Sequence, residues 1–250
     1  MKIVRHDAYI AKRKRRALIL AIVGFLLLIG TLFLAVNPSL ILPSYLAMLF
    51  GFVVFNIGMQ QVGKWSRSPR NDQVIDHRLK SLSDRYTVVH YADTGAKRID
   101  HLLVHPGGVA VLVSREIDGS IERVKNKWRR RSGGLRRFLT FSGPQLGDPD
   151  LEMDGNIKAV EAFLESNQLE VDVDGAIVFV HPGTEFDIED PVYPVLHGDE
   201  LLQFVNSLPV DPSFGTKERE HLVSLLRGDD LPSAPSASSS RRRPVKRRAA

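Results

Sequence analysis

The chain has 250 residues, of which 43% are hydrophobic and 25% are charged, with 34 basic residues, 29 acidic residues and no cysteine. Averages of this kind are typical of one soluble globular domain. Residues 17–63, however, contain no Asp, Glu, Lys or Arg, and a run of 47 uncharged residues excludes a purely soluble protein. The absence of cysteine excludes a disulfide framework, a thiolate metal site and a cysteine nucleophile.

The net charge of +5 is distributed unevenly along the chain. Residues 1–16 carry seven basic side chains and one acidic one, residues 229–250 carry six and two, and residues 64–228 have a net charge of −5. We interpret residues 1–16 as a basic cytoplasmic N-terminus. We expect residues 229–250, which are rich in Pro, Ser, Ala and Arg, to form a disordered basic tail that binds lipid or another polyanion.

The uncharged run predicts a transmembrane helical hairpin over residues 17–63. Residues 17–36 have the length that crosses the hydrocarbon core as a helix, residues 40–62 form a second span, and an Asn-Pro-Ser break at residues 37–39 separates them. Basic residues flank both outer ends and none lies in the connection, so both termini and the globular domain are expected in the cytoplasm. A cleaved signal peptide is the alternative, which the long basic lead and the second span disfavour.

A polar linker at residues 64–71 precedes one predicted α/β domain over residues 72–228, a length that is ample for a single core. Helical spacing of apolar residues, and short apolar runs between turn residues, define its elements. We expect helices over residues 72–82, 156–164, 199–208 and 216–227, and strands over residues 86–91, 99–104, 109–113, 120–128, 135–141, 176–180 and 192–196. The expected hairpin turns are the His-Pro-Gly-Gly segment at 105–108 and the Ser-Gly-Gly segment at 132–134.

The segment RIDHLLVHPGGVAVLVSR at residues 98–115, followed by Gly119, resembles the nuclease-related domain family. That family shows an Ile-Asp-His segment, a turn, an apolar strand and then Glu-x-Lys. Asp72 lies where the family often has a helix Glu, and Gln145 resembles a further recurrent Gln. The resemblance covers residues 72–180. It implies a restriction-endonuclease-like fold, with a mixed β-sheet flanked by helices and an acidic site that binds a divalent cation and cleaves phosphodiester bonds.

The sequence retains only part of the site that this resemblance implies. Asp100 matches the family's Asp, whereas Val113 stands at the Glu position and Arg115 at the Lys position. Valine cannot ligate a metal, and arginine is a poor proton-transfer group because it is always protonated. We therefore expect no catalytic site, no metal and no other cofactor, with Asp100 and Arg115 as vestigial residues. The alternative is an active Mg²⁺-dependent nuclease in which Glu116 or Asp118 supplies the missing carboxylate beside Asp100.

A second candidate site is the segment 123–137, which is strongly basic and contains no acidic residue. Cations on a hairpin can bind the phosphates of nucleic acid while an aromatic side chain stacks on a base. In a domain tethered to a membrane they can equally bind anionic headgroups, and a solvated hairpin without a ligand is the third interpretation. The candidate binding residues are Arg123, Lys125, Lys127, Trp128, Arg129, Arg130, Arg131, Arg136 and Arg137.

Together these features predict an integral protein of the cell membrane with a cytoplasmic nuclease-related domain. We expect that domain to be catalytically inactive and to act as a binding or scaffold module. The expected partners are membrane lipids, reached through the two spans and the basic ends, and nucleic acid, reached through the segment 123–137. An active nuclease built around Asp100 and a structural subunit of a membrane complex are the alternatives.

Overall fold

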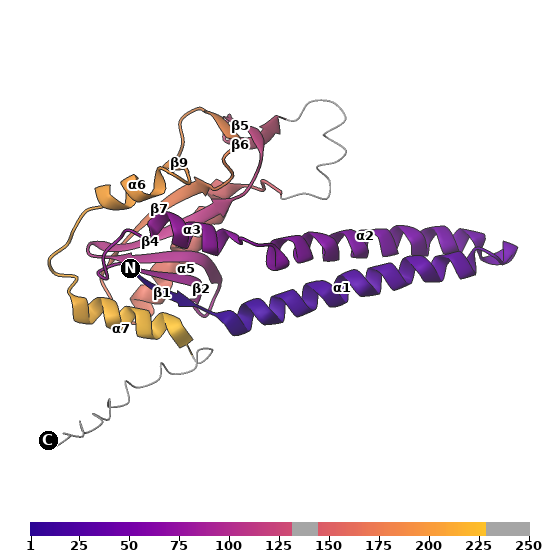
Figure 1. The fold of residues 1–250 in the computed structure, drawn as a ribbon, viewed down its shortest axis with the longest axis horizontal. Coiled ribbons are helices and arrows are strands. Elements are labelled where there is room, and N and C mark those ends of the chain that lie inside the picture. Colours follow the sequence, from indigo (N-terminus) through magenta and orange to yellow (C-terminus); the bar gives the residue numbers. More distant parts are fainter. Residues whose placement is uncertain (132–144, 229–250) are drawn as a thin grey trace, which may run out of the picture.

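The computed structural model describes residues 1–131 and 145–228 and shows a long helical hairpin that projects from a mixed α/β domain (Figure 1). The hairpin consists of α1 (Asp7–Leu34) and α2 (Ile41–Ser66), joined by a short 3₁₀ helix, η1 (Pro38–Leu40). By length and composition, both helices are apolar and long enough to cross a membrane. Helix α1 begins at Asp7 rather than at residue 17, so the basic residues 12–16 belong to the same helix.

The two long helices pack through small residues and turn their large apolar side chains outward. A Cβ atom on Gly24 would stand 2.3 Å from the backbone nitrogen of Phe55, and one on Gly58 would stand 2.4 Å from that of Ala21. Phe33, in contrast, is 76% exposed. Membrane helices use this arrangement, because lipid solvates large apolar side chains while close backbone contact supplies the packing.

The domain is built on a six-stranded mixed sheet with the order β1-β2-β3-β4-β7-β9. Its strands are β1 (Lys2–Arg5), β2 (Thr87–Asp93), β3 (Arg98–His105), β4 (Gly108–Arg115), β7 (Asp172–Phe179) and β9 (Val195–His197). Strand β3 is antiparallel to β2 and β4, whereas the pairs β1–β2, β4–β7 and β7–β9 are parallel. The α/β class and the mixed sheet predicted from the sequence are thus confirmed.

Strand β1 is an element that the sequence pattern does not predict, because its residues lie in the basic segment ahead of α1. It pairs with β2 along its whole length and forms one edge of the sheet. Val4 is only 5% exposed and belongs to the main apolar cluster. The first residues are therefore part of the domain, and a fragment that begins at residue 64 lacks an edge strand.

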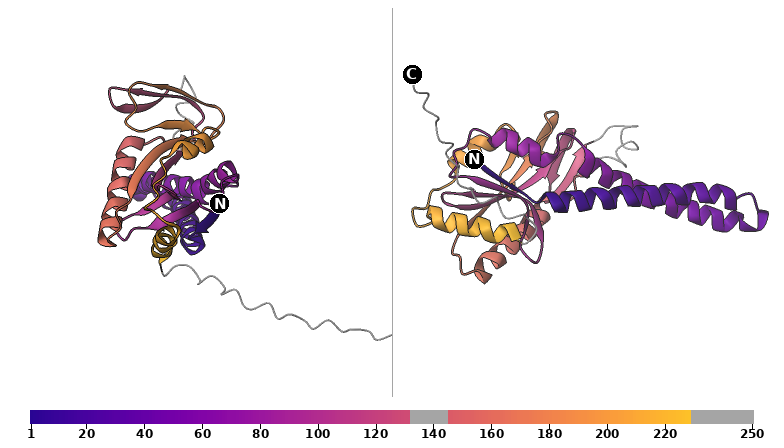
Figure 2. Two further views of the ribbon diagram at one scale, coloured as in Figure 1. Left: turned by 90° about the vertical axis from the view of Figure 1, so that its left-hand side faces the viewer. Right: turned by 60° about the horizontal axis from the view of Figure 1, so that its bottom comes forward.

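Helices cover both faces of the central sheet (Figure 2). One face carries α3 (Asn71–Leu79) and α6 (Leu201–Ser207), and the other carries α5 (Pro149–Ser166) and α7 (Thr216–Arg227). Ile75 and Leu201 belong to the apolar cluster of the first face, and Val160 and Leu222 to that of the second. Each helix overlaps the range predicted for it, because helical spacing of apolar residues survives in both clusters.

A second sheet with the order β6-β5-β8 lies beside the first. Its strands are β5 (Gly119–Val124), β6 (Lys127–Arg131) and β8 (Thr184–Ile188), of which β8 has no predicted counterpart. The single strand predicted over residues 120–128 is wrong. The chain turns at Lys125 and Asn126, whose positive φ angles of 51° and 60° fit a two-residue hairpin turn. The predicted strand over residues 135–141 lies outside the described residues.

Candidate functional site

Asp100 and Val113 lie next to each other in the central sheet. The register of β3 with β4 pairs Leu102 with Val111, which puts Val113 level with Asp100. In the register of β2 with β3, Tyr91 stands opposite Asp100. Tyr91 has a φ of 60°, a left-handed conformation that is uncommon for a bulky side chain. The sheet therefore brings the family's Asp and Glu positions together, at a place where the backbone of the neighbouring strand is distorted.

The carboxylate of Asp100 is paired with a cation from the end of the helical hairpin. Nζ of Lys64, in the last turn of α2, lies 3.2 Å from Oδ2 of Asp100. Desolvation raises the pKa of Asp100, but the charges of Lys64 and other neighbours together lower it below the usual value. Val113 is 1% exposed and packs in the apolar core. Asp100 is thus an ionised carboxylate with an ammonium partner and an apolar neighbour.

Glu116 and Asp118, the two acids considered as replacements for Val113, follow β4. Glu116 forms an ion pair with Arg67, in the segment that leads from α2 into α3. Asp118 lies with Oδ1 3.8 Å from Nδ1 of His181. The Glu116 carboxylate is therefore neutralised by the linker, as Asp100 is neutralised by α2.

Asp72, at the family's helix acid position, has cationic partners as well. Its side chain is fully buried in α3, with Oδ2 2.8 Å from Nε of Arg5 and Oδ1 2.9 Å from Nε of Arg70. Burial raises the pKa of Asp72, but the hydrogen bond and charge of Arg70, with other neighbours, lower it below the usual value. The acid consequently ties strand β1 and the start of α3 together.

Arg115 fastens β4 to helix α5. Its guanidinium donates from Nε to the carbonyl oxygen of Leu146 at 2.8 Å, and its Nη2 lies 2.5 Å from Oε2 of Glu152. The side chain is 14% exposed. Gln145, the further residue of the family resemblance, is exposed just ahead of α5. Arg115 therefore has a packing role at the position where the family has its lysine.

These side chains do not fit a divalent cation. Mg²⁺ is bound by oxygen atoms from several groups that converge on one point, whereas Asp72, Asp100 and Glu116 each carry a separate ion pair. Over residues 1–131 and 145–228, no group of three or more His, Asp or Glu side chains is placed to hold a metal ion. Among the described residues, these acids are thus divided among separate ion pairs and do not converge on one point.

An aromatic cluster stands beside these ion pairs and joins the base of the hairpin to the sheet. Tyr9 of α1 contacts Trp65 of α2 and Tyr91 of β2, with ring centroids 5.8 Å and 5.7 Å away. Trp65 and Tyr91 are 5% and 4% exposed, so their rings form a small core of their own. We call this cluster, together with the ion pairs Lys64–Asp100 and Arg67–Glu116, the junction.

A chain of buried hydrogen bonds runs beneath the junction from α3 to β4. Nε2 of His90 lies 2.8 Å from Oδ1 of Asp76, the two Nδ1 atoms of His90 and His101 are 2.8 Å apart, and Nε2 of His101 lies 2.9 Å from Oγ of Ser114. A carboxylate can only accept hydrogen bonds. In a pair of neutral rings, His90 therefore donates to Asp76, His101 donates to His90, and Ser114 donates to His101. Sequence reasoning missed this chain, because the two histidines look isolated in the pattern.

The buried position of His101 keeps its ring neutral near pH 7. His90 and His101 are 0% and 1% exposed. Burial, and after it the neighbouring His90, lowers the pKa of His101 to about 3. The hydrogen bond between the two rings needs one Nδ1 atom that carries a proton and one that does not. In a doubly protonated pair both Nδ1 atoms carry a proton. The hydrogen bond between the two rings is therefore lost when both are protonated.

The basic segment divides into an exposed part and a buried part. Lys127, Arg129 and Arg131 alternate along β6 and point to solvent, and Lys125 is exposed in the turn. Glu122 of β5 shares this face and lies 3.2 Å from Nη1 of Arg131. The exposed cations therefore form a row on an edge strand, which we call the β6 row: Lys125, Lys127, Arg129 and Arg131.

Two predicted binding residues face the core instead. Arg123 is 2% exposed. Its guanidinium donates to Oδ2 of Asp150 at 2.8 Å and to the carbonyl oxygens of Glu189 and Asp190 at 2.9 Å and 2.6 Å. The indole of Trp128 is half-buried and donates to the same Asp150 oxygen at 2.9 Å. Arg123 and Trp128 therefore lie off the exposed face of β6, because alternation along the strands turns them inward.

Three further residues of the segment 123–137 are predicted to bind a ligand: Arg130, Arg136 and Arg137. Arg130 is half-buried on the inward face of β6. Arg136 and Arg137 lie outside the described residues.

A family model described as the nuclease-related domain matches residues 67–180. No curated protein and no solved structure matches the chain. The matched segment runs from the linker through β4 and α5 to the end of β7, and it contains the junction acids Asp100 and Glu116. The resemblance carried by residues 98–115 is thereby confirmed.

Proposed function

Residues 67–180 form a nuclease-related domain, and we propose that this domain is held at the cell membrane by α1 and α2, does not cleave nucleic acid, and acts as a binding module. The observation that carries the proposal is that Asp72, Asp100 and Glu116 are each neutralised by a cation. Lys64 and Arg67 come from the end of the hairpin and the segment after it. Asp100 and Glu116 therefore attach the domain to the hairpin.

The charge distribution supports a cytoplasmic position for the domain. Residues 12–16 are all basic and precede the apolar part of α1, and Lys64 and Arg67 follow the apolar part of α2. The connection between the helices carries no charge. The positive-inside rule then places the domain and both ends of the chain on the cytoplasmic side.

The β6 row supports a phosphate-bearing ligand for the binding module. Its exposed cations alternate on one face of an edge strand, with Glu122 as their acidic neighbour. Cations on an exposed strand bind a phosphate backbone or a headgroup layer mainly by charge, without a shaped pocket. Nucleic acid and anionic lipid are the two sources of such phosphates. The binding experiment below distinguishes them.

The test uses the full chain, because β1 and the junction belong to the fold. The protein in nanodiscs of neutral lipid is mixed with single- and double-stranded DNA and RNA, with Mg²⁺, Mn²⁺ or EDTA, and cleavage and binding are followed together. In parallel, detergent-solubilised protein is mixed with vesicles that contain anionic lipid. We expect no cleavage, and binding to a phosphate surface that is insensitive to EDTA and weakens as salt rises.

The matched variants are Lys127→Ala with Arg129→Ala and Arg131→Ala, and Lys80→Ala with Lys217→Ala, two exposed cations elsewhere on the domain. If duplex DNA is the ligand, losing each phosphate contact lowers the slope of log affinity against log salt by about 0.9. The first variant should bind weakly and the second normally. Metal-dependent cleavage that disappears in Asp100→Ala contradicts the proposal. Binding to neither nucleic acid nor anionic vesicles contradicts it as well, and favours a structural subunit.

A further inference from the structure

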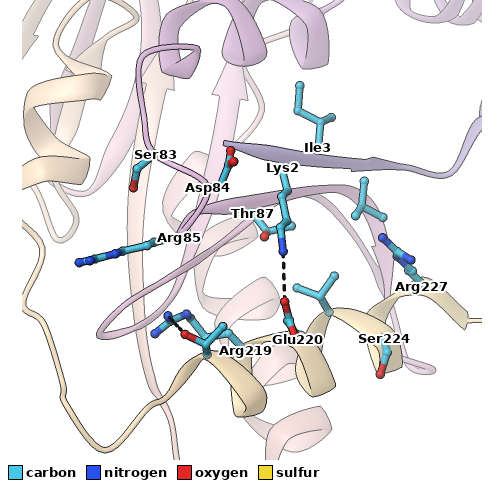
Figure 3. Close-up of a pocket in the computed structure, with 13 residues that line it drawn as sticks. Lys2, Ile3, Ser83, Asp84, Arg85, Thr87, Arg219, Glu220, Ser224 and Arg227 are labelled. Atoms are coloured by element: carbon cyan, nitrogen blue, oxygen red, sulfur yellow. Dashed lines mark hydrogen bonds and ion pairs between the residues drawn. The ribbon is translucent and has the colours of Figure 1, made fainter. Parts of the chain in front are cut away.

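A cavity of about 670 Å³ opens between strand β1 and helix α7 (Figure 3). In Figures 1 and 2 helix α7 and strand β6 lie on opposite sides of the domain, so this cavity is separate from the β6 row. Its walls come from β1, from the segment that leads into β2 and from α7. A volume of this size is within the range of small-molecule sites.

The lining of the cavity is cationic. Lys2, Arg85, Arg219 and Arg227 outnumber the acids Asp84 and Glu220. Both acids already have partners, since Glu220 lies 3.2 Å from Nζ of Lys2 and Asp84 lies 2.9 Å from the amino group of Met1. In the part of the chain that the structure describes, no acidic group pairs with Arg85 or Arg227. The cavity thus offers positive charge that is not compensated from within.

The arginines are not spread evenly around the cavity. Figure 3 shows Arg85 and Arg219 at one end and Arg227 at the other, with the Lys2–Glu220 pair between them. Arg219 is held in place by donating from Nη1 to the carbonyl oxygen of Phe214 at 2.6 Å and from Nη2 to Oγ1 of Thr216 at 3.1 Å. A guanidinium that is already oriented, beside one that has no acidic partner, is a favourable arrangement for an anion with several oxygen atoms.

The rest of the wall is apolar. Val4 of β1, on the same face of the strand as Lys2, and Val223 of α7 line the cavity, whereas Figure 3 shows Ile3 pointing away from α7. A small inorganic anion would use the arginine end and leave this wall in contact with water. A ligand with an apolar or aromatic body attached to its anionic group would cover both.

We propose that the cavity binds a phosphorylated small molecule, with the phosphate between Arg85 and Arg219 and the attached body against Val4 and Val223. Residues 229–250 are unsuitable occupants, because their net charge is positive like that of the cavity. The ten residues Asp7–Arg16 separate β1 from the apolar part of α1 by about 15 Å of helix. That distance favours a ligand that enters from solution over one embedded in the bilayer.

The test measures ligand binding by calorimetry with the full chain in detergent micelles. The probes are pyrophosphate, ADP and a short-chain soluble phosphatidic acid, which separate a bare anion, a nucleotide and a lipid source. We expect ADP or the phosphatidic acid to bind at least tenfold more tightly than pyrophosphate. Arg85→Ala should weaken that binding at least tenfold, whereas Lys217→Ala, an exposed cation on α7 that does not line the cavity, should not change it.

A second variant keeps the test independent of charge. Ser224→Trp, on the exposed side of α7 where it lines the cavity, should fill the space and abolish binding while the thermal unfolding temperature is kept. Failure of all three probes to bind overturns the proposal. So does binding that survives both Arg85→Ala and Ser224→Trp, or equal affinity for pyrophosphate and the larger probes.

Discussion

The contrast between Asp100 and Val113 shows what one missing carboxylate does to a site. The sheet still brings the two positions together, but only one of them can bear charge. A lone carboxylate that is partly desolvated needs a counter-charge, and Lys64 supplies it at 3.2 Å. The same reasoning applies to Glu116 with Arg67 and explains why the acids of this region are paired with cations.

The buried histidines give a prediction at the residue scale. Burial holds the folded-state pKa of His101 near 3, below the ordinary 6.5, and lowers the pKa of His105 to about 4. Between the folded-state pKa of each histidine and 6.5, the unfolded chain binds more protons than the folded chain. The stability that each neutral ring contributes is therefore complete above pH 6.5 and is lost as the pH falls. Each such histidine can change the free energy of unfolding by about 1.4 kcal/mol per pH unit within its window.

We therefore expect the thermal unfolding temperature of the full chain in detergent to fall steadily from pH 7 to pH 4. His101→Gln should flatten this dependence without removing it, because His105 still titrates. His77→Gln, an exposed histidine on α3, should retain the full slope. A wild-type unfolding temperature that stays constant over this range would contradict the assignment of neutral, buried rings.

At the scale of elements, the hairpin depends on close contact between α1 and α2. Gly24 and Gly58 face the opposite backbone so closely that a Cβ atom cannot be placed without moving a helix, whereas nothing lies within 4 Å of a Cβ atom at Gly30. We expect Gly24→Leu to lower the thermal unfolding temperature by several degrees and Gly30→Leu to leave it nearly unchanged. Equal effects of the two substitutions would mean that the helices do not pack as described.

The same scale shows how far the sequence alone predicts this fold. The β3–β4 hairpin and the helices α5 and α7 follow from local spacing, because their apolar residues repeat with the period of the element. Strand β1 does not follow, since the strand it pairs with, β2, lies far along the chain. The sequence pattern predicts a strand through Lys125 and Asn126, because a lysine in a hairpin turn is not a strong local signal.

The candidate site divides in the same way. The segment 98–115 alone predicts that Val113 stands at the second carboxylate position, and this stays a prediction. The partners of Asp100 and Arg123 cannot, because Lys64 and Asp150 approach them only through the tertiary fold. Alternation along β6 would have identified Trp128 as inward-facing, had the boundary of the strand been known.

At the scale of the whole molecule, the helical hairpin and the domain are joined at two ends rather than by one flexible linker. Strand β1 leads through His6, whose Nε2 lies 3.1 Å from the carbonyl oxygen of Leu226 in α7, directly into α1. Helix α2 leaves through Trp65 and Lys64, which contact the sheet. The orientation of the domain relative to the hairpin is therefore fixed by packing, and a ligand beside β1 would lie next to the start of α1.

The most direct test of the central claim is Mn²⁺ binding to the full chain, measured by electron paramagnetic resonance as the loss of the free-ion signal. The wild-type protein should bind no more Mn²⁺ than Asp100→Ala. The reason is that the acids of the site are in ion pairs with Lys64, Arg67, Arg5 and Arg70. A variant that combines Val113→Glu with Lys64→Ala should gain a site, since two carboxylates then stand level without a competing ammonium. Stoichiometric binding by the wild type that disappears in Asp100→Ala would contradict the account.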